Sequence, residues 1–330
     1  MPVTQADVAA RAGVSRRTVS NVVNNFPHVS ADVRRRVREI IDELGYTPSQ
    51  AARSLRTGRS GVIQLVIPEL DVPYFAELAR SVTRDAESRG LNVLITQTSG
   101  DARRELAALN SETGEHAEGT ILSAVAINAE TLASRTAANP LVLVGERRLP
   151  GVDHVGIDDV AASRSATEHL LGLGRRRVAF VGADSREQLH MAGMRRRGYL
   201  QALEAAGVDA EADLIVPTES YHRQDGARAV ERLLSLSEPP DALFCATDLL
   251  AIGAMFAANA HGVSIPDDLA VVGFDDLEEG RFYIPSLSSV SPDKALIARR
   301  AVDLIIDPPT TPRGDVLLPF ELAVRGSSVE

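Results

Sequence analysis

Residues 12–25 read AGVSRRTVSNVVNN, and this stretch predicts a short helix that carries two adjacent arginines. Ser15 is placed to cap the helix, and valines at helical spacing form its apolar stripe. Upstream, Thr4 and Asp7 have the spacing of a capping box for an earlier helix, which Gly13 would end. Two short helices joined by a tight turn predict a helix-turn-helix.

A third helix is expected from Ser30, with Gly45 as its end. Its inward positions are apolar, and its solvated side carries Arg34, Arg35, Arg36 and Arg38. Residues 1–60 hold ten Arg against five Asp and Glu, although the whole chain has a net charge of −10. Such asymmetry indicates a small basic module on an acidic body.

A helix-turn-helix places the N-terminal residues of its second helix against base edges in the DNA major groove. Arg can bond bidentately to guanine and Asn to adenine, and the base-reading positions here hold Arg16, Arg17 and Asn21. Short polar side chains suited to phosphate contacts are Thr4, Ser15, Thr18, Ser20, Asn24 and His28. From spacing alone, a small helical bundle with a solvated arginine face stays open as the alternative.

From Gly61 onward, short apolar runs alternate with longer amphipathic stretches. The expected strands are VIQLVIP, LNVLIT, GTILSAV and LVLVGE, with helices between them at about 74–89, 101–113 and 129–138. After HVGIDD the rhythm restarts with RVAFVGA, LIVPTE, ALFCATD and LAVVGFDD. This alternation predicts an α/β fold with two parallel sheets, each covered by helices on both faces.

Several classes of protein do not fit this composition. Cys245 stands alone, which excludes a disulfide framework within the chain and favours the reducing cytoplasm. The N-terminus lacks the apolar run of a signal peptide, and no later stretch approaches the roughly eighteen apolar residues of a membrane span. The seven His are scattered, and GLGRRR precedes a strand instead of following one, so neither a metal nor a dinucleotide cofactor is expected.

The stretch VTQADVAARAGVSRRTVSNVVNNFPHVSADVRRRVREIIDELGYTPSQAARSLRTGRSGVIQLVIPEL, residues 3–70, resembles the lac repressor (LacI/GalR) family of bacterial transcription regulators. The resemblance runs through most of the chain. It implies an N-terminal helix-turn-helix domain and a body like a periplasmic binding protein, with two lobes joined by three crossing strands. The implied divisions are a DNA-binding domain at 1–48, a hinge helix and linker at 49–60, an N-terminal lobe at 61–157 plus about 291–318, and a C-terminal lobe at 158–290 plus about 319–330.

The segment SQAARSL, residues 49–55, is too short for a stable isolated helix. The resemblance implies that two copies of it pair in the DNA minor groove. There Leu55 would act as an apolar wedge that partly unstacks a base step, and the small Ala52 would let the paired helices approach. A plain flexible tether is the alternative.

In α/β bodies, ligands bind at strand ends that face a cleft. By resemblance, the effector-binding residues are Tyr74, Phe75, Arg195, Tyr221, Thr247, Asp248 and Asp275. Thr247 replaces the Asn that is usual in the family before Asp248, which leaves the identity of the effector open. Other roles remain possible: Asp275 and Asp276 could cap the turn after AVVGF, Arg195 could lie on a surface helix, and Tyr221 could be a packing aromatic.

The sequence therefore predicts a DNA-binding transcriptional regulator that is not an enzyme. By resemblance, it favours repression and a sugar as the effector bound between the lobes. A homodimer on a pseudo-palindromic operator is expected, because a dimer doubles the phosphate contacts and reads two half-sites. The resemblance favours a dimer over a tetramer, since the final residues LAVRGSSVE do not have the leucine heptad that makes some members of the family tetrameric. A solute-binding transport component would need an export signal, and a sugar-modifying enzyme would need a catalytic constellation that we do not find.

Overall fold

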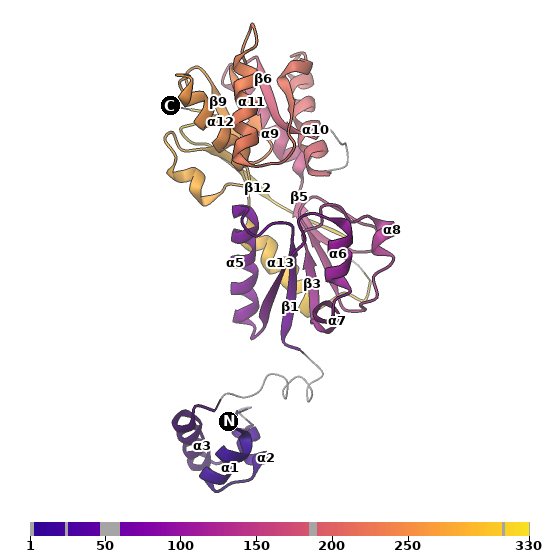
Figure 1. The fold of residues 1–330 in the computed structure, drawn as a ribbon, viewed down its shortest axis with the longest axis vertical. Helices are drawn as coiled ribbons and strands as arrows, with labels where there is room; N and C mark the ends of the chain where they lie inside the picture. Colours follow the sequence, from indigo (N-terminus) through magenta and orange to yellow (C-terminus); the bar gives the residue numbers. More distant parts are fainter. Residues whose placement is uncertain (1–2, 24–25, 47–59, 185–189, 312–313, 330) are drawn as a thin grey trace. The chain divides into compact units, whose positions relative to one another are not determined.

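The computed structural model describes residues 3–23, 26–46, 60–184, 190–311 and 314–329. The chain forms two compact units, Met1–Gly61 and Val62–Glu330, which we take in turn (Figure 1). Within 3–23 and 26–46, the described part of the first unit, the chain forms α1 (Gln5–Ala12), α2 (Arg16–Val23) and α3 (Ala31–Leu44). They confirm the helices predicted in this segment.

The ends of these helices lie where the local signals place them. The Asp7 carboxylate accepts a hydrogen bond from the Thr4 backbone N–H at 2.8 Å, and Ser15 Oγ accepts one from the Thr18 N–H at 3.1 Å. Gly13 follows α1 with a φ of 64°, the left-handed conformation that ends helices. The three helices enclose a small core of Val8, Ala9, Ala12, Val19, Val22 and Val37.

The second unit contains two six-stranded sheets, and we call the part built on the first sheet the first lobe. Its strand order is β11-β5-β4-β3-β1-β2, and all neighbouring strands are parallel. The strands are β1 (Val62–Ile67), β2 (Asn92–Gln97), β3 (Gly119–Leu122), β4 (Leu141–Val144), β5 (Asp153–Ile157) and β11 (Asp315–Leu318).

Helices cover both faces of this sheet. One face packs against α5 (Pro73–Ser88) and α13 (Lys294–Ile306), which also contact each other. The other packs against α6 (Ala102–Leu109) and α8 (Ala129–Leu132), with α7 (Glu112–His116) beside α6. Successive side chains of a strand point to opposite faces, and Leu65 and Val66 of β1 accordingly belong to two different core clusters.

We call the part built on the other sheet the second lobe. Its strand order is β12-β10-β9-β8-β6-β7. The strands are β6 (Val178–Ala183), β7 (Ile215–Pro217), β8 (Ala242–Cys245), β9 (Ala270–Phe274), β10 (Ser288–Pro292) and β12 (Phe320–Ala323). The helices are α9 (Asp159–Gly172), α10 (His190–Ala205), α11 (Arg223–Leu234) and α12 (Asp248–Ala260), with the 3₁₀ turns η1 (Ala212–Leu214) and η2 (Glu278–Phe282). Helix α9 packs on α10, and α11 packs on α12.

The expectation of parallel sheets is confirmed except at one edge. Strand β12 runs antiparallel to β10, so the second sheet is mixed. The chain leaves the second lobe at the end of β10 and returns to it from β11 of the first lobe at the start of β12, so β10 and β12 run in opposite directions. The chain passes between the lobes three times, after β5, after β10 and after β11 (Figure 1).

Two expected helices differ from the structure. The helix expected at 101–113 is divided into α6 and α7, because Ser111 accepts from the Gly114 N–H and starts a new helix. The helix expected at 129–138 ends at Leu132. Beyond it, the Asn110 side chain bonds the backbone of Ser134 and Thr136, so tertiary contacts replace helical hydrogen bonds there.

Helices α11 and α12 approach each other at two glycines. A Cβ atom on Gly253 would lie 1.8 Å from the Arg223 carbonyl oxygen, and one on Gly226 would lie 2.0 Å from that of Leu250. We therefore expect Gly253→Ala to lower the free energy of unfolding by about 1–3 kcal/mol, measured by urea denaturation. Gly193→Ala in α10 is the control, since its Cβ would meet nothing within 4 Å. Equal stability of the two variants would contradict this packing.

Candidate functional site

A cavity of about 500 Å³ opens between the two lobes of the second unit. It is lined by residues that follow strands of both sheets. In the first lobe, Glu69 follows β1, Ser123 follows β3 and Glu146 follows β4. In the second lobe, Thr247 follows β8 and Asp275 follows β9. The cavity is thus made by the carboxyl ends of strands.

The topology of each sheet explains why the cavity lies there. Strand order reverses at β1, which has β2 on one side and β3 on the other, and again at β6, between β7 and β8. Open α/β sheets bind ligands in the crevice at such a reversal, because adjacent loops leave the sheet in opposite directions. Here the reversals of two sheets face one cavity.

Arg195 is the most enclosed charge of the cavity, with 3% of the residue exposed. Its Nε donates to Asp159 Oδ1 at 3.0 Å, and its Nη2 donates to Glu146 Oε1 at 2.9 Å. Its Nη1 donates to the Ala246 carbonyl oxygen and lies 3.8 Å from Asp275 Oδ1. Because Glu146 belongs to the first lobe, the Arg195–Glu146 ion pair joins the lobes.

Helix packing brings Arg195 to its partners. Gly198 lies one turn further along α10 on the same face as Arg195. A Cβ at this position would be 2.2 Å from the Val160 carbonyl oxygen, so only glycine allows this close approach to α9. Asp159 is the first residue of α9, and the approach places its carboxylate against the guanidinium.

Aromatic side chains supply the apolar walls of the cavity. Tyr74 and Phe75 lie in the first turn of α5, with their rings edge to face at 5.3 Å, and Tyr221 lines the cavity from the second lobe. Burial, reinforced by the nearby carboxylate of Glu146, raises the pKa of the Tyr74 phenol well above its usual range. The cavity therefore combines ring faces with buried charges.

Asp275 carries its carboxylate into the cavity from an unusual backbone conformation. Its φ is 108° and that of Asp276 is 45°, both in the left-handed region that non-glycine residues rarely adopt. Burial raises the pKa of Asp275 to about 7, opposed by the positive charges of Arg195 and Lys294. Burial likewise raises the pKa of Asp159 to about 6.

These shifts predict how stability depends on pH. Between about pH 4 and pH 7, folded Asp275 keeps a proton that the unfolded chain has lost, so stability falls as the pH rises through this range. Asp275→Asn removes this titration. From pH 5 to pH 8, the difference in unfolding free energy should therefore move in favour of the variant by on the order of 2 kcal/mol. Urea denaturation at both pH values measures it, with the exposed Asp209→Asn as control. Parallel pH profiles for wild type and Asp275→Asn would contradict the shift.

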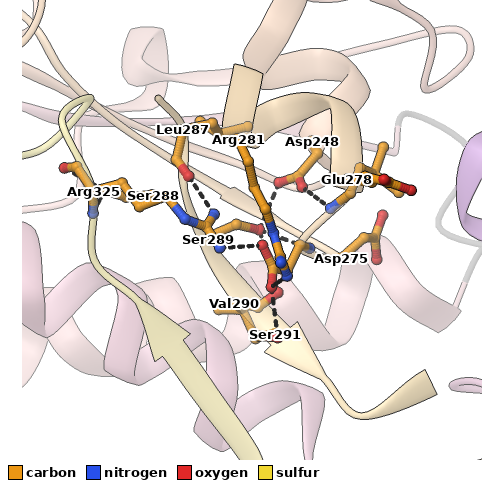
Figure 2. A network of polar contacts seen from close by, with 12 residues as sticks. Asp248, Asp275, Glu278, Arg281, Leu287, Ser288, Ser289, Val290, Ser291 and Arg325 are labelled. Carbon is orange, nitrogen blue, oxygen red and sulfur yellow. Dashed lines mark hydrogen bonds and ion pairs between the residues drawn. The ribbon is translucent and has the colours of Figure 1, made fainter. Parts of the chain in front are cut away.

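The structure brings together all the predicted effector residues except Asp248. Tyr74, Phe75, Arg195, Tyr221, Thr247 and Asp275 all line the cavity. Asp248 does not: its Oδ1 accepts from Ser289 Oγ at 2.6 Å and its Oδ2 accepts from the Leu277 N–H at 2.7 Å (Figure 2). Its carboxylate fills the space that Gly273 leaves, where a Cβ would lie 2.2 Å from Oδ1. Asp248 therefore holds the loop after β9 and does not line the cavity, and its contact with effector stays a prediction.

The structure places the residues of two alternatives that the sequence leaves open. Asp276 holds the turn, because its carboxylate accepts from Arg325 at 2.6 Å, Arg281 at 2.9 Å and Ser291 at 2.9 Å. Arg195 is buried, so it is not a surface helix residue. Cys245 is a buried core residue, as expected for a thiol within an apolar strand.

Some site residues were not predicted from the sequence. Glu146 and Arg147 line the cavity after LVLVG, and His222 places its Nε2 3.3 Å from Glu69 Oε2 of the other lobe. Glu146 had a usable signal, since it follows a buried strand as Asp275 does. The others lie in loops without a comparable pattern.

The first unit presents its predicted DNA-binding residues at or near the surface. Thr4, Ser15, Arg16, Arg17 and His28 are exposed, whereas the partly buried ones are Thr18, Ser20 and Asn21. Arg17 lies in the first turn of α2, while the buried Val19 and Val22 anchor that helix to the core. Asn24, Ala52 and Leu55 lie outside the described residues.

No group of three or more His, Cys, Asp or Glu side chains is arranged to hold a metal ion within the described ranges. No helix in the same part of the chain has the length and apolar character needed to cross a membrane.

Comparison with known proteins gives matches along the whole chain. Residues 4–49 match bacterial regulatory proteins of the lacI family, and residues 167–328 match the periplasmic binding protein-like domain. Catabolite control protein A of Priestia megaterium is 31% identical over 333 residues, which cover 99% of this chain and 100% of that protein.

Solved structures share the architecture. The lac repressor dimer bound to operator and the anti-inducer ONPF aligns with a TM-score of 0.85 and 25% identity, covering 100% of both chains. A complex of the transcriptional regulator CelR with cellobiose aligns with a TM-score of 0.71 and 29% identity, covering 99% of this chain and 100% of that one.

Proposed function

The chain belongs to the lacI family of bacterial regulatory proteins, and we propose that it is a repressor whose affinity for operator DNA is set by a sugar in the interlobe cavity. Family membership makes it a DNA-binding transcription regulator and not an enzyme. The observation that carries the sugar assignment is the pairing of buried Arg195 and Asp275 with aromatic rings where two sheets reverse their strand order.

The chemistry of the cavity favours a hydroxyl-rich, uncharged effector. Asp275 can accept two hydroxyl hydrogen bonds, and Arg195 can donate to ring or hydroxyl oxygens. Arg195 already faces three carboxylates, those of Asp159, Glu146 and Asp275, so an anionic ligand would add repulsion. Tyr74, Phe75 and Tyr221 offer ring faces to the apolar side of a sugar, and Thr247 offers a hydroxyl. The cellobiose complex of the relative supports this class of ligand.

For DNA recognition, we assign base reading to Arg16, Arg17 and Asn21. Thr4, Ser15, Thr18, Ser20, Asn24 and His28 are assigned to phosphate contacts. Ala52 and Leu55 are assigned to the minor groove. The exposure of Arg16 and Arg17 on α2 supports the first assignment, and the operator complex of the lac repressor supports the mode of binding. The proposal includes action in the cytoplasm, where operator DNA lies.

We propose a homodimer as the active species. The second lobe exposes large apolar side chains, with Phe256 at 71%, Phe282 at 79% and Ile284 at 91% exposure. Exposed apolar residues of this size are typical of protein interfaces when they cluster, and the last two are separated in the chain only by Tyr283, which is itself exposed. A twofold pair reads two half-sites, so the operator should be pseudo-palindromic.

Effector controls DNA binding by shifting the population between conformations that differ in the angle between the lobes. Effector that binds both lobes stabilises one angle between them, and the favoured angle changes operator affinity. The coupling is reciprocal: if effector weakens operator binding, operator must weaken effector binding by the same factor.

The test has a DNA arm and a ligand arm. Full-length protein is used to select operators from random duplexes, and a thermal-shift screen covers neutral sugars, their phosphates and nucleosides. We expect selected pseudo-palindromic DNA, dimers by sedimentation that Ile284→Asp separates, and a neutral sugar that changes operator affinity. Sugar binding with no DNA preference would instead favour a solute-binding role and overturn the proposal.

A further inference from the structure

The turn that carries Asp275 is held from both lobes. Each backbone N–H from Asp275 to Glu278 has a different acceptor. The Asp275 N–H donates to the Val290 carbonyl, that of Asp276 to Ser289 Oγ, that of Leu277 to Asp248, and that of Glu278 to Glu77 Oε1 at 3.0 Å. Only the acceptor on Glu77 belongs to the first lobe. Figure 2 shows the second-lobe part of this network around Asp248 and Ser289.

Lys294 binds the backbone carbonyl groups of the same turn. Its Nζ donates to the carbonyl oxygens of Asp275 and Asp276, the latter at 3.1 Å, and lies 3.0 Å from Glu77 Oε2. An ammonium group has three donors, and these contacts account for all of them. The side chains of Lys294 and Glu77 are only 13% and 14% exposed. The contact is thus largely shielded from water.

The pair belongs to the first lobe, although its targets belong to the second. Glu77 lies on α5 and Lys294 is the first residue of α13, and these two helices pack against each other on the first sheet. Asp275 and Asp276 both have positive φ, a conformation that persists only where the surroundings enforce it. Glu77 and Lys294 of the first lobe supply part of the contacts that hold this conformation.

We propose that Glu77 and Lys294 are positioning residues of the effector site. From the first lobe they hold the turn that presents the Asp275 carboxylate, so the placement of this carboxylate depends on the angle between the lobes. This inference rests on the proposed function of the cavity. Through these direct contacts at the edge of the cavity, a change in the angle between the lobes changes how the Asp275 carboxylate meets the ligand.

The charge of Lys294 provides a readout that a purely structural contact would not move. The titratable groups around Asp275 are Arg195, Lys294, Glu146, Asp159, Asp248 and the Tyr74 phenol. The ammonium group favours the ionised form of Asp275, and its removal should therefore raise the midpoint of the Asp275 titration. Loss of the two carbonyl contacts should at the same time release the backbone of the turn.

The experiment uses full-length protein without ligand or DNA. Lys294→Met keeps the length of the side chain but removes its charge and donors, and Lys294→Arg keeps the charge. Arg300→Met is the matched control, since Arg300 lies on the same helix with a side chain 54% exposed. Carbon-13 NMR follows the Asp275 carboxyl titration, assigned by its loss in Asp275→Asn, and hydrogen exchange follows the amides of 276–278.

For Lys294→Met we expect the Asp275 midpoint to rise by at least about one pH unit and the amides of 276–278 to exchange at least about tenfold faster. Lys294→Arg should largely restore the midpoint, and Arg300→Met should match wild type. Faster exchange with an unchanged midpoint, or no change in either, overturns the proposal. Should Lys294→Met not fold, Glu77→Gln provides the same two readouts: the amide of Glu278 should exchange faster, whereas the Asp275 midpoint should fall, because this variant removes a negative charge. Unchanged exchange and an unchanged midpoint in Glu77→Gln overturn the proposal.

Lysine labelling gives an independent signal. Lys294 is the single lysine of the chain, so protein labelled with ¹⁵Nζ-lysine yields one ammonium resonance. We expect that resonance to be protected from exchange in wild type and to lose protection in Glu77→Gln; equal protection in both overturns the role of Glu77. Operator binding by the same samples tests the proposed function separately, because these readouts need neither DNA nor sugar.

Discussion

Arg195→Met is expected to abolish the response of operator binding to effector and to lower the free energy of unfolding by about 3–5 kcal/mol. The buried guanidinium is the shared partner of Asp159, Glu146 and Asp275, and its loss leaves these carboxylates without a counter-charge at that position. Urea denaturation measures the stability, and operator titration with and without the sugar identified by the screen measures the response.

Two variants separate the causes of this effect. Arg196→Met changes the exposed neighbour and should alter stability by no more than about 0.5 kcal/mol. Adding Asp159→Asn to Arg195→Met removes one uncompensated charge and should recover part of the stability but none of the effector response. A normal effector response in Arg195→Met would refute its role as a ligand, whatever its stability.

The strands of the two sheets show what could be predicted from the sequence. Short, continuous apolar runs such as those of β1 and β9 are buried on both faces, and their pattern in the sequence predicts these strands. Strands β10, β11 and β12 were missed, because SSVSP, DVLL and FELA are short and polar in part. Strands β11 and β12 lie at sheet edges, where partial exposure removes the continuous apolar signal.

The residues around the cavity likewise divide into those that the sequence predicts and those that it does not. Arg195 and Asp275 could be placed because each belongs to a family pattern whose spacing is local, MRRRGY and AVVGFDD. The sequence does not determine the direction of the Asp248 carboxylate, since a strand-end carboxylate can turn toward the cavity or toward the loop behind it, and here Ser289 and Leu277 bind it at the loop. The sequence does not predict the contacts of Lys294 with Glu77 and Asp275, because they join residues far apart in the chain.

On the DNA-binding unit, Arg17→Ala is expected to remove most of the preference for operator over random DNA while leaving effector binding unchanged. A good bidentate contact to a base contributes roughly 1–3 kcal/mol of discrimination, and a symmetric dimer makes it twice, so the loss should be about 2–6 kcal/mol. Competition binding with operator and random duplexes at one fixed salt concentration measures the ratio, because non-specific affinity depends steeply on salt.

Arg35→Ala is the matched control for this variant, since Arg35 is an exposed arginine on α3 that pairs with Asp32 at 3.0 Å and lies outside the proposed base-reading helix. Its loss should change affinity for operator and random DNA by the same factor, because a contact with phosphates carries no sequence information. If Arg17→Ala behaves like Arg35→Ala, then α2 does not read bases through Arg17, and sequence preference must come from the other side chains of that helix or from DNA shape.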